Sequence, residues 1–330
     1  MKRWLKPSFL LAIALLCTAE LIMHIFFQED FSGRFEYGYN PTSGFDEGSD
    51  GIVHLVPAGG RHFLRQSFTK THSPATFRIM VIGDSVTRGP SLKNAYPWLI
   101  GEQLRENGIQ AECFNLGVPG YGAHRKFIVL QKALDYMPDL IILQVNDSNE
   151  HDDDRELKRS QDFKGWNSKN LMMKSLLLRR IYEAETEKLF WKWLPTVIRD
   201  QKSVNDADAK VAASLSPEKR IEWSARVLKY TMQSIALSLS KNVPILLIVQ
   251  AEYQKGNPKL DDHNLEYLIG NTKRKGVYLL SMKRLFEPLD FDKLFSSGHH
   301  LYPAGHKIIA EAVVKMLQHG SLANIKTTAH

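Results

Sequence analysis

Apolar and polar positions alternate along the chain in a pattern that predicts strands and helices in turn. Short apolar runs bounded by turn residues predict buried strands at residues 77–83, 109–117, 139–145, 245–251 and 276–282. Between and after them, apolar residues recur every three or four positions and predict helices at 96–107, 123–137, 217–239 and 305–320. This alternation favours an α/β fold with a parallel sheet covered by helices on both faces.

The N-terminal segment carries a long apolar run. Residues 8–27 are enough to cross a bilayer as a helix, and Lys2, Arg3 and Lys6 precede them. Basic residues on that side predict that the remainder of the chain lies outside the cytoplasm. We therefore expect residues 1–30 to be a signal anchor with one transmembrane helix.

Other features of this run favour a cleaved signal peptide instead. Glu20 and His24 are costly inside a membrane, and Cys17-Thr18-Ala19 offers the small residues that a signal peptidase recognises. Cleavage after Ala19 would leave an apolar new N-terminus, LIMHIFF. The anchor is the preferred interpretation for that reason, and both interpretations export the domain.

Composition divides the rest of the chain. Residues 31–76 are rich in Gly, Pro, Ser and charge and predict a spacer or N-terminal extension ahead of a domain at 77–330. Residues 150–215 break the strand–helix rhythm and predict a helical insertion. Within that stretch, the charged sequence at 151–154 predicts a solvated loop rather than a metal site.

Charge and cysteine content exclude two classes of function. The chain has 43 basic and 36 acidic residues, and the net charge of +7 is spread without a basic block, so we expect no nucleic-acid partner. The two cysteines, Cys17 and Cys113, provide no metal framework, and Cys17 lies in the first apolar run, which argues against a structural disulfide.

Four polar stretches follow or flank the predicted elements: IGDSVTRG at 82–89, NLGVPGYG at 115–122, QVND at 144–147 and SSGHHLYPAGH at 296–306. The first three leave strand ends, and ligands of open α/β sheets bind at the carboxyl ends of the strands. Together the four stretches supply a hydroxyl, an unobstructed backbone amide, a side-chain amide and an imidazole. Those groups are the components of acyl transfer through a serine nucleophile.

This set of motifs resembles the SGNH hydrolase superfamily, also called GDSL esterases. The resemblance covers about residues 77–318, with 150–215 unmatched. It implies a three-layer α/β/α sandwich, similar to flavodoxin, around a parallel sheet of about five strands. It also implies Ser85 as the nucleophile, His300 as the general base, and Gly120 and Asn146 as oxyanion-hole donors, with no metal or cofactor.

The last block departs from the pattern of the family, which usually places an aspartate three residues before the histidine. Ser297 occupies that position here. A Ser85–His300 dyad could operate with Ser297 or a backbone carbonyl orienting the imidazole. Asp290 or Asp292 could replace the acid, or the site could be weakened and serve a binding or assembly role.

The resemblance and the expected export together predict a bacterial envelope esterase. We expect it in the inner membrane, single-pass, with its catalytic domain in the periplasm. Its expected partners are the membrane, through the N-terminal helix, and an ester-bearing substrate such as polysaccharide with O-acetyl or other short acyl groups. Acyl transfer to a sugar hydroxyl by the same fold is the nearest enzymatic alternative.

Overall fold

The structure is a computed structural model that describes residues 7–26, 38–42, 44–55, 63–154, 156–157, 175, 177, 216–256, 259–270 and 274–323. Most of the insertion predicted at 150–215 lies outside these residues.

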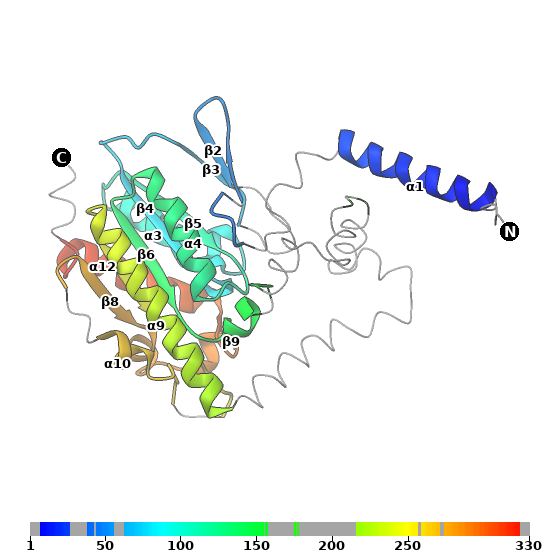
Figure 1. Cartoon of the computed structure of the whole chain (residues 1–330). Helices are drawn as coiled ribbons and strands as arrows, with labels where there is room; N and C mark the ends of the chain where they lie inside the picture. Colours follow the sequence, from blue (N-terminus) through cyan, green and yellow to red (C-terminus); the bar gives the residue numbers. More distant parts are fainter. Residues whose placement is uncertain are drawn as a thin grey trace.

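Five parallel strands form the centre of the domain (Figure 1). They are β4 (Phe77–Gly83), β5 (Ala111–Gly117), β6 (Leu140–Val145), β7 (Ile245–Val249) and β8 (Val277–Ser281). Their order across the sheet is β5-β4-β6-β7-β8. Every residue of β4, β6 and β7 is buried, which explains why these strands are mainly apolar rather than alternating between apolar and polar residues. The prediction of a parallel sheet of about five strands is confirmed.

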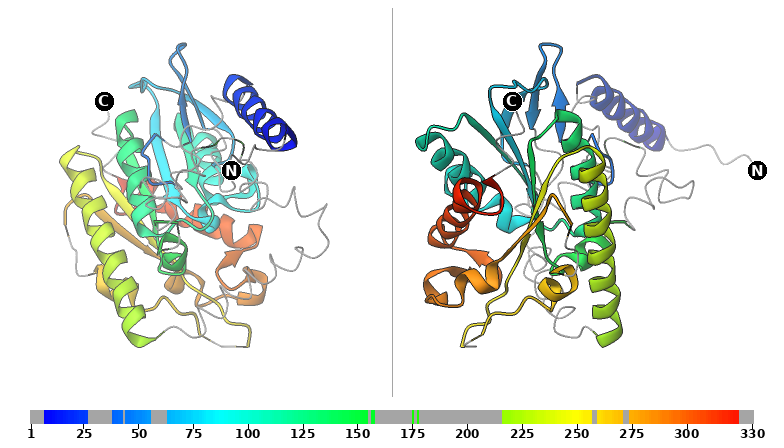
Figure 2. Two further views of the ribbon diagram at one scale, coloured as in Figure 1. Left: turned by 45° about the vertical axis from the view of Figure 1, so that its right-hand side comes forward. Right: turned by 90° about the vertical axis from the view of Figure 1, so that its left-hand side faces the viewer.

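Helices cover both faces of this sheet and complete three layers (Figure 2). One face packs against α4 (Ala123–Ala133), the long helix α9 (Pro217–Ser240) and α10 (Leu265–Gly270). The other face packs against α3 (Tyr96–Glu106), α11 (Met282–Phe286) and α12 (Pro303–His319). Alternate residues of β4 point to opposite layers, so Met80 and Ile82 belong to the first core and Ile79 and Val81 to the second.

A second, antiparallel sheet comes from the segment predicted as a spacer or extension. It contains β1 (Phe45–Glu47), β2 (Ile52–Leu55) and β3 (Gln66–Thr69) in that order. Phe45, Val53 and Phe68 are buried in the same core as the α4 layer. The described part of residues 31–76 is therefore packed on the α/β domain.

The N-terminal helix α1 (Pro7–Phe26) has 20 residues, and many of its large apolar side chains, such as Leu11 and Leu15, are exposed. Within the part of the chain that the structure describes, no helix is long and apolar enough to cross a membrane. The transmembrane helix expected in residues 1–30 is thus not supported.

The loops that carry the predicted motifs lie at the carboxyl end of the sheet. The short helix α2 (Ser85–Arg88) begins directly after β4, and the 3-10 helix η3 (Leu92–Asn94) follows it. The 3-10 helix η4 (Leu134–Tyr136) extends α4 at the opposite end. A hairpin of β9 (Phe295–Ser297) and β10 (His300–Leu301) comes after the 3-10 helix η5 (Phe291–Lys293) and leads into α12.

Candidate active site

Ser85 and His300 meet at this end of the sheet, although they are 215 positions apart in the sequence. Ser85 is the first residue of α2, and His300 is the first residue of β10. The His300 Nε2 atom and the Ser85 Oγ atom lie 2.9 Å apart. This is hydrogen-bond distance, and it is the arrangement that a base needs to accept a proton from a serine nucleophile. The structure therefore brings the predicted nucleophile and base together.

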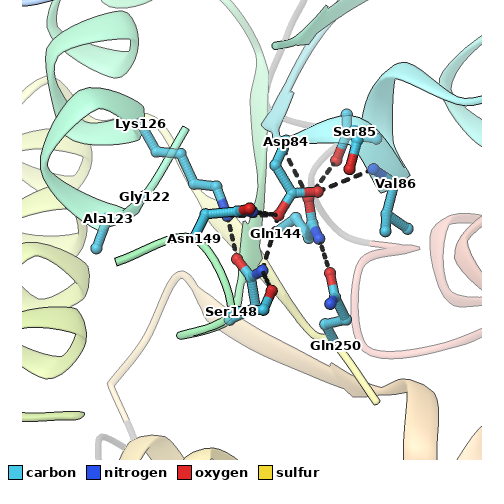
Figure 3. A network of polar contacts seen from close by, with 12 residues as sticks. Asp84, Ser85, Val86, Gly122, Ala123, Lys126, Gln144, Ser148, Asn149 and Gln250 are labelled. Carbon is cyan, nitrogen blue, oxygen red and sulfur yellow. Dashed lines mark hydrogen bonds and ion pairs between the residues drawn. The ribbon is translucent and has the colours of Figure 1, made fainter. Parts of the chain in front are cut away.

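Asp84 anchors the bend that presents Ser85 (Figure 3). Its side chain is 0% exposed, and its Oδ1 atom accepts from the backbone N–H of Val86 at 2.9 Å, which caps α2. Its Oδ2 atom accepts from Asn146 at 2.8 Å and from Asn149 at 2.6 Å, and it lies 3.3 Å from the Lys126 ammonium. Sequence reasoning did not assign a role to the Asp84 carboxylate, to Asn149 or to Lys126.

These partners keep Asp84 ionised. Burial alone would raise its pKa, because the charged form loses its hydration. The Lys126 ammonium, the neighbouring His299 and the hydrogen bonds outweigh burial, so the pKa of Asp84 is lowered. A carboxylate is thus held beside the nucleophile with donors on both of its oxygens.

Gly83 lets the bend pack tightly against β6. A Cβ atom at this position would lie 1.9 Å from the Thr87 Oγ1 atom and 2.4 Å from the Gln144 Oε1 atom. That same Gln144 oxygen accepts from the Asp84 backbone N–H at 2.9 Å and from the Thr87 hydroxyl at 2.8 Å. The glycine of the motif is therefore required by space, and the polar side chain of β6 fixes the direction of the bend.

Asn146 follows β6 and is nearly buried, at 4% exposure. Its Nδ2 atom donates to Asp84 and also to the Ser148 hydroxyl, while its Oδ1 atom accepts from Lys126. The two sides of the amide therefore have distinct partners. Sequence analysis predicted Asn146 as an oxyanion-hole donor. To fill that role, Asn146 would have to redirect one of its two N–H groups from Asp84 or Ser148 to the oxyanion.

The loop after β5 carries Gly120. The Val118 N–H donates to the Gly83 carbonyl at 3.0 Å, which brings this loop against the bend after β4. Gly120 has φ +75°, a left-handed conformation that favours glycine. The Arg125 guanidinium donates to the Gly120 carbonyl and pairs with the Asp153 carboxylate, so α4 holds the loop in place. The oxyanion-hole role of Gly120 stays a prediction.

The charged stretch at 151–154 is not the solvated loop that its composition suggested. Asp153 is 1% exposed, and its carboxylate accepts from the backbone N–H groups of Gly122 and His124 at 2.9 and 3.1 Å. The first N–H groups of a helix have no partner inside it, so the start of α4 attracts these acids. Among the described residues, no group of three His, Cys, Asp or Glu is arranged to hold a metal ion.

The candidate orienting acids of the sequence analysis contact other residues. The Asp292 Oδ1 atom accepts from the Tyr253 hydroxyl at 2.7 Å, and Asp290 pairs with Lys293 at 3.0 Å. Ser297 lies opposite His300 in the backbone register of the hairpin. The group that orients the His300 imidazole stays a prediction.

Two further histidines lie on the His300 side of the site. The His299 ring packs on the His300 ring with centroids 4.4 Å apart, and burial lowers the pKa of His299 to about 4. The His263 Nδ1 atom lies 2.7 Å from the Asp147 Oδ1 atom, and this hydrogen bond raises the pKa of His263 to about 9. At neutral pH, His299 is therefore neutral and His263 is an imidazolium.

Comparison with known proteins gives structural neighbours only. No family model and no curated protein matches this chain. A GDSL-like lipase from Bacteroides thetaiotaomicron is 8% identical and covers 73% of this chain and 88% of its own, with a TM-score of 0.39. A mutant of an acetyl-xylooligosaccharide esterase from Geobacillus is 13% identical and covers 73% and 94%, with a TM-score of 0.44.

An α/β hydrolase from the metagenome of Lake Arreo is 14% identical and covers 75% of this chain and 96% of its own, with a TM-score of 0.45. These neighbours include a GDSL-like lipase and an esterase. At these identities and scores, the chemistry of this chain has to be argued from its own residues.

Proposed function

We propose that this chain is an SGNH-type serine esterase that hydrolyses short acyl esters through an acyl-enzyme. The observation that carries the proposal is the 2.9 Å separation of the Ser85 Oγ and His300 Nε2 atoms at the carboxyl end of a parallel sheet. A serine hydroxyl becomes an effective nucleophile only when a base can take its proton, and this pair meets that requirement.

The reaction begins when His300 Nε2 takes the Ser85 proton and Oγ attacks the ester carbonyl carbon. The carbonyl oxygen becomes an oxyanion, for which the backbone N–H groups of Ser85 and Gly120 and the Asn146 amide are the donors. The C–O bond to the alcohol then breaks, and the imidazolium gives its proton to the departing oxygen. Water, deprotonated by His300, attacks the acyl-enzyme; the bond between the acyl group and Ser85 Oγ breaks, His300 returns the proton to Oγ, and the carboxylic acid is released.

The surroundings of Ser85 support this sequence of steps. Asp84 is held as a carboxylate by Lys126, Asn146 and Asn149, so the bend that carries the nucleophile is fixed before any substrate binds. A bend that is fixed in advance does not have to reorganise during the reaction. The imidazole is oriented by Ser297 or a backbone carbonyl in this proposal, because Asp290 and Asp292 contact other residues.

The test uses the full-length chain and p-nitrophenyl acetate. Ser85→Ala is expected to abolish enzymatic hydrolysis and labelling by a fluorophosphonate probe. Ser91→Ala is the matched control, because the Ser91 hydroxyl accepts from Asn94 at 3.0 Å and belongs to the neighbouring η3 cap. Equal rates and equal labelling in the wild-type chain and Ser85→Ala would show that the protein is not a serine esterase.

The substrate proposed for this site is an O-acetyl or other short acyl ester on an envelope polysaccharide. Release of acetate from an acetylated polysaccharide, measured with and without an added sugar acceptor, separates hydrolysis from acyl transfer. Transfer of the acetyl group to the acceptor in place of acetate release would favour the acyltransferase. Binding of the polysaccharide without either product would favour a weakened binding or assembly protein.

Export of the domain, with the site in the periplasm, completes the proposal. It is supported by the basic residues Lys2, Arg3 and Lys6 ahead of an apolar helix whose side chains are exposed. An alkaline phosphatase fusion after residue 60 should be active. An inactive but expressed fusion would contradict export.

A further inference from the structure

Lys126 is a buried cation that neither the motifs nor the proposed reaction requires. It lies on α4 and is 2% exposed. Figure 3 shows its side chain extending from α4 toward Asp84 and the residues that follow β6. Lysine is almost never fully buried unless it is paired, because the ammonium group loses its hydration.

The contacts of the ammonium group point to two partners. It lies 3.3 Å from the Asp84 Oδ2 atom and donates a hydrogen bond to the Asn146 Oδ1 atom. The Asp84 Oδ2 atom already accepts from the amides of Asn146 and Asn149. Neutralising Asp84 is therefore only part of what Lys126 does, and its direct hydrogen bond to Asn146 needs an explanation of its own.

We propose that Lys126 is a positioning residue for the oxyanion hole and acts through Asn146. A cation at Oδ1 fixes which end of the amide is oxygen and which is nitrogen. It also draws electron density from the amide, so the N–H groups of Asn146 become stronger donors. The inference rests on the proposed esterase function.

The remaining contacts of Asn146 show how a donor could reach the substrate. One N–H is held by the Asp84 carboxylate, a strong acceptor, and the other is given to the half-buried Ser148 hydroxyl. A negatively charged carbonyl oxygen is a stronger acceptor than a hydroxyl and takes the second N–H as the tetrahedral intermediate forms. Lys126 thus raises the rate of the chemical step and leaves ground-state binding unchanged.

The experiment must separate this role from simple pairing with Asp84. Lys126→Met removes the charge and keeps the length of the side chain, but it leaves the Asp84 carboxylate unpaired in a buried position. The double variant Lys126→Met/Asp84→Asn removes both charges and is compared with Asp84→Asn alone. The full-length variants are assayed for kcat and KM on p-nitrophenyl acetate, for Ser85 labelling by a fluorophosphonate, and for melting temperature.

We expect the double variant to have at least a tenfold lower kcat than Asp84→Asn, with KM within twofold and a similar melting temperature. Equal kcat values in these two variants would overturn the inference, because Lys126 would then act only on Asp84. If the wild-type chain is neither active nor labelled at Ser85, the proposed function falls, and this inference falls with it.

A further variant keeps the inference testable if the double variant does not fold. Lys126→Gln keeps an N–H donor for Asn146 but carries no charge. We expect a loss of kcat of three- to tenfold at unchanged KM in this folded variant. Wild-type kcat in Lys126→Gln would overturn the polarising role of the charge.

Discussion

The two halves of the candidate site are built differently. The Ser85 half is buried and held together by a hydrogen-bond network. Asp84, Gln144 and Asn146 are each 4% exposed or less, and hydrogen bonds connect them across β4, β6 and α4. The His300 half is a short hairpin whose histidine is exposed. A hydrogen bond from the Tyr253 N–H to the Gly298 carbonyl, at 2.9 Å, connects the hairpin turn to the segment after β7.

This difference assigns different tasks to the two halves. Charge develops on the nucleophile and the carbonyl oxygen, so the groups around Ser85 gain from being fixed in advance. The base has to take a proton, turn it toward the alcohol and later activate water, which an exposed imidazole on a hairpin permits. We therefore expect substitutions in the first half to affect both stability and rate, and most substitutions in the second half to affect neither strongly.

His300 itself is the exception, and its replacement is expected to have the largest effect. His300→Ala removes the base and should lower kcat by roughly 10³- to 10⁶-fold. His299→Ala is the matched control, because the His299 Nδ1 atom faces Glu252 at 3.9 Å and the side chain makes no described contact with Ser85. We expect less than a tenfold loss from His299→Ala on p-nitrophenyl acetate, and a loss equal to that of His300→Ala would show that the base has been misassigned.

The second-largest effect is expected from a substitution of Gly83, in the hydrogen-bonded Ser85 half. Gly83→Ala would place a methyl group against Thr87 and Gln144, and overpacking of this kind costs about 1–3 kcal/mol of stability. We expect a lower free energy of unfolding and a lower kcat, measured by urea denaturation and esterase assay. Gly270→Ala, where nothing lies within 4 Å of the added atom, should change both only slightly. Similar effects of the two substitutions would contradict the proposed packing of the bend.

A pH-dependent effect is expected on the His300 side. The pKa of His263 is raised to about 9 by Asp147, above the value of about 6.5 in the unfolded chain. The stabilisation from this pair is therefore complete below pH 6.5 and is lost as the pH rises through about 9. His263→Gln should lower the melting temperature by a few degrees at pH 6 and by much less at pH 9.5. A constant difference across this range would mean that the pair does not titrate as described.

The smallest effects are expected at the two aspartates that could have replaced the missing acid. Asp292→Asn disturbs a contact with the Tyr253 hydroxyl, and Asp290→Asn disturbs a surface pair with Lys293 and the cap of η5. Surface pairs contribute about 0–1 kcal/mol to the free energy of unfolding, so both variants should stay folded. Because neither aspartate contacts His300 in the described structure, we expect kcat within threefold of the wild-type value for both. A hundredfold loss in either variant would identify that aspartate as the group that orients His300.

The apolar runs predicted the parallel sheet, and the resemblance to the SGNH hydrolases named Ser85 and His300, whose side chains lie within hydrogen-bond distance. The strands β4, β6 and β7 are buried on both faces and therefore appear as mainly apolar runs, in which Arg78 and Gln144 are the polar exceptions. The same reasoning did not predict the bounds of strands β1 to β3, because their buried residues are isolated aromatic and aliphatic side chains in a polar, glycine-rich segment.

The buried charges were the hardest features to predict. Lys126 lies on the same helical face as the buried residues Val129 and Ala133. This spacing in the sequence could have indicated that Lys126 is buried. Asp153 gave no such signal, because an acid in a charged run is usually solvated and only the start of α4 explains its position. Pairing partners distant in sequence decide whether a charge is buried, and local pattern does not contain them.

The small sheet β1–β3 is joined to the α/β domain by polar contacts as well as by its buried side chains. The Tyr39 hydroxyl donates to the Asp153 carbonyl at 2.8 Å, and the Glu47 carboxylate accepts from Lys132 at 2.5 Å, so the chain is fastened to the domain from residue 39 onward. The sheet is therefore part of the folded domain, and a chain that begins at residue 77 would lose the side chains of Phe45, Val53 and Phe68 from its core.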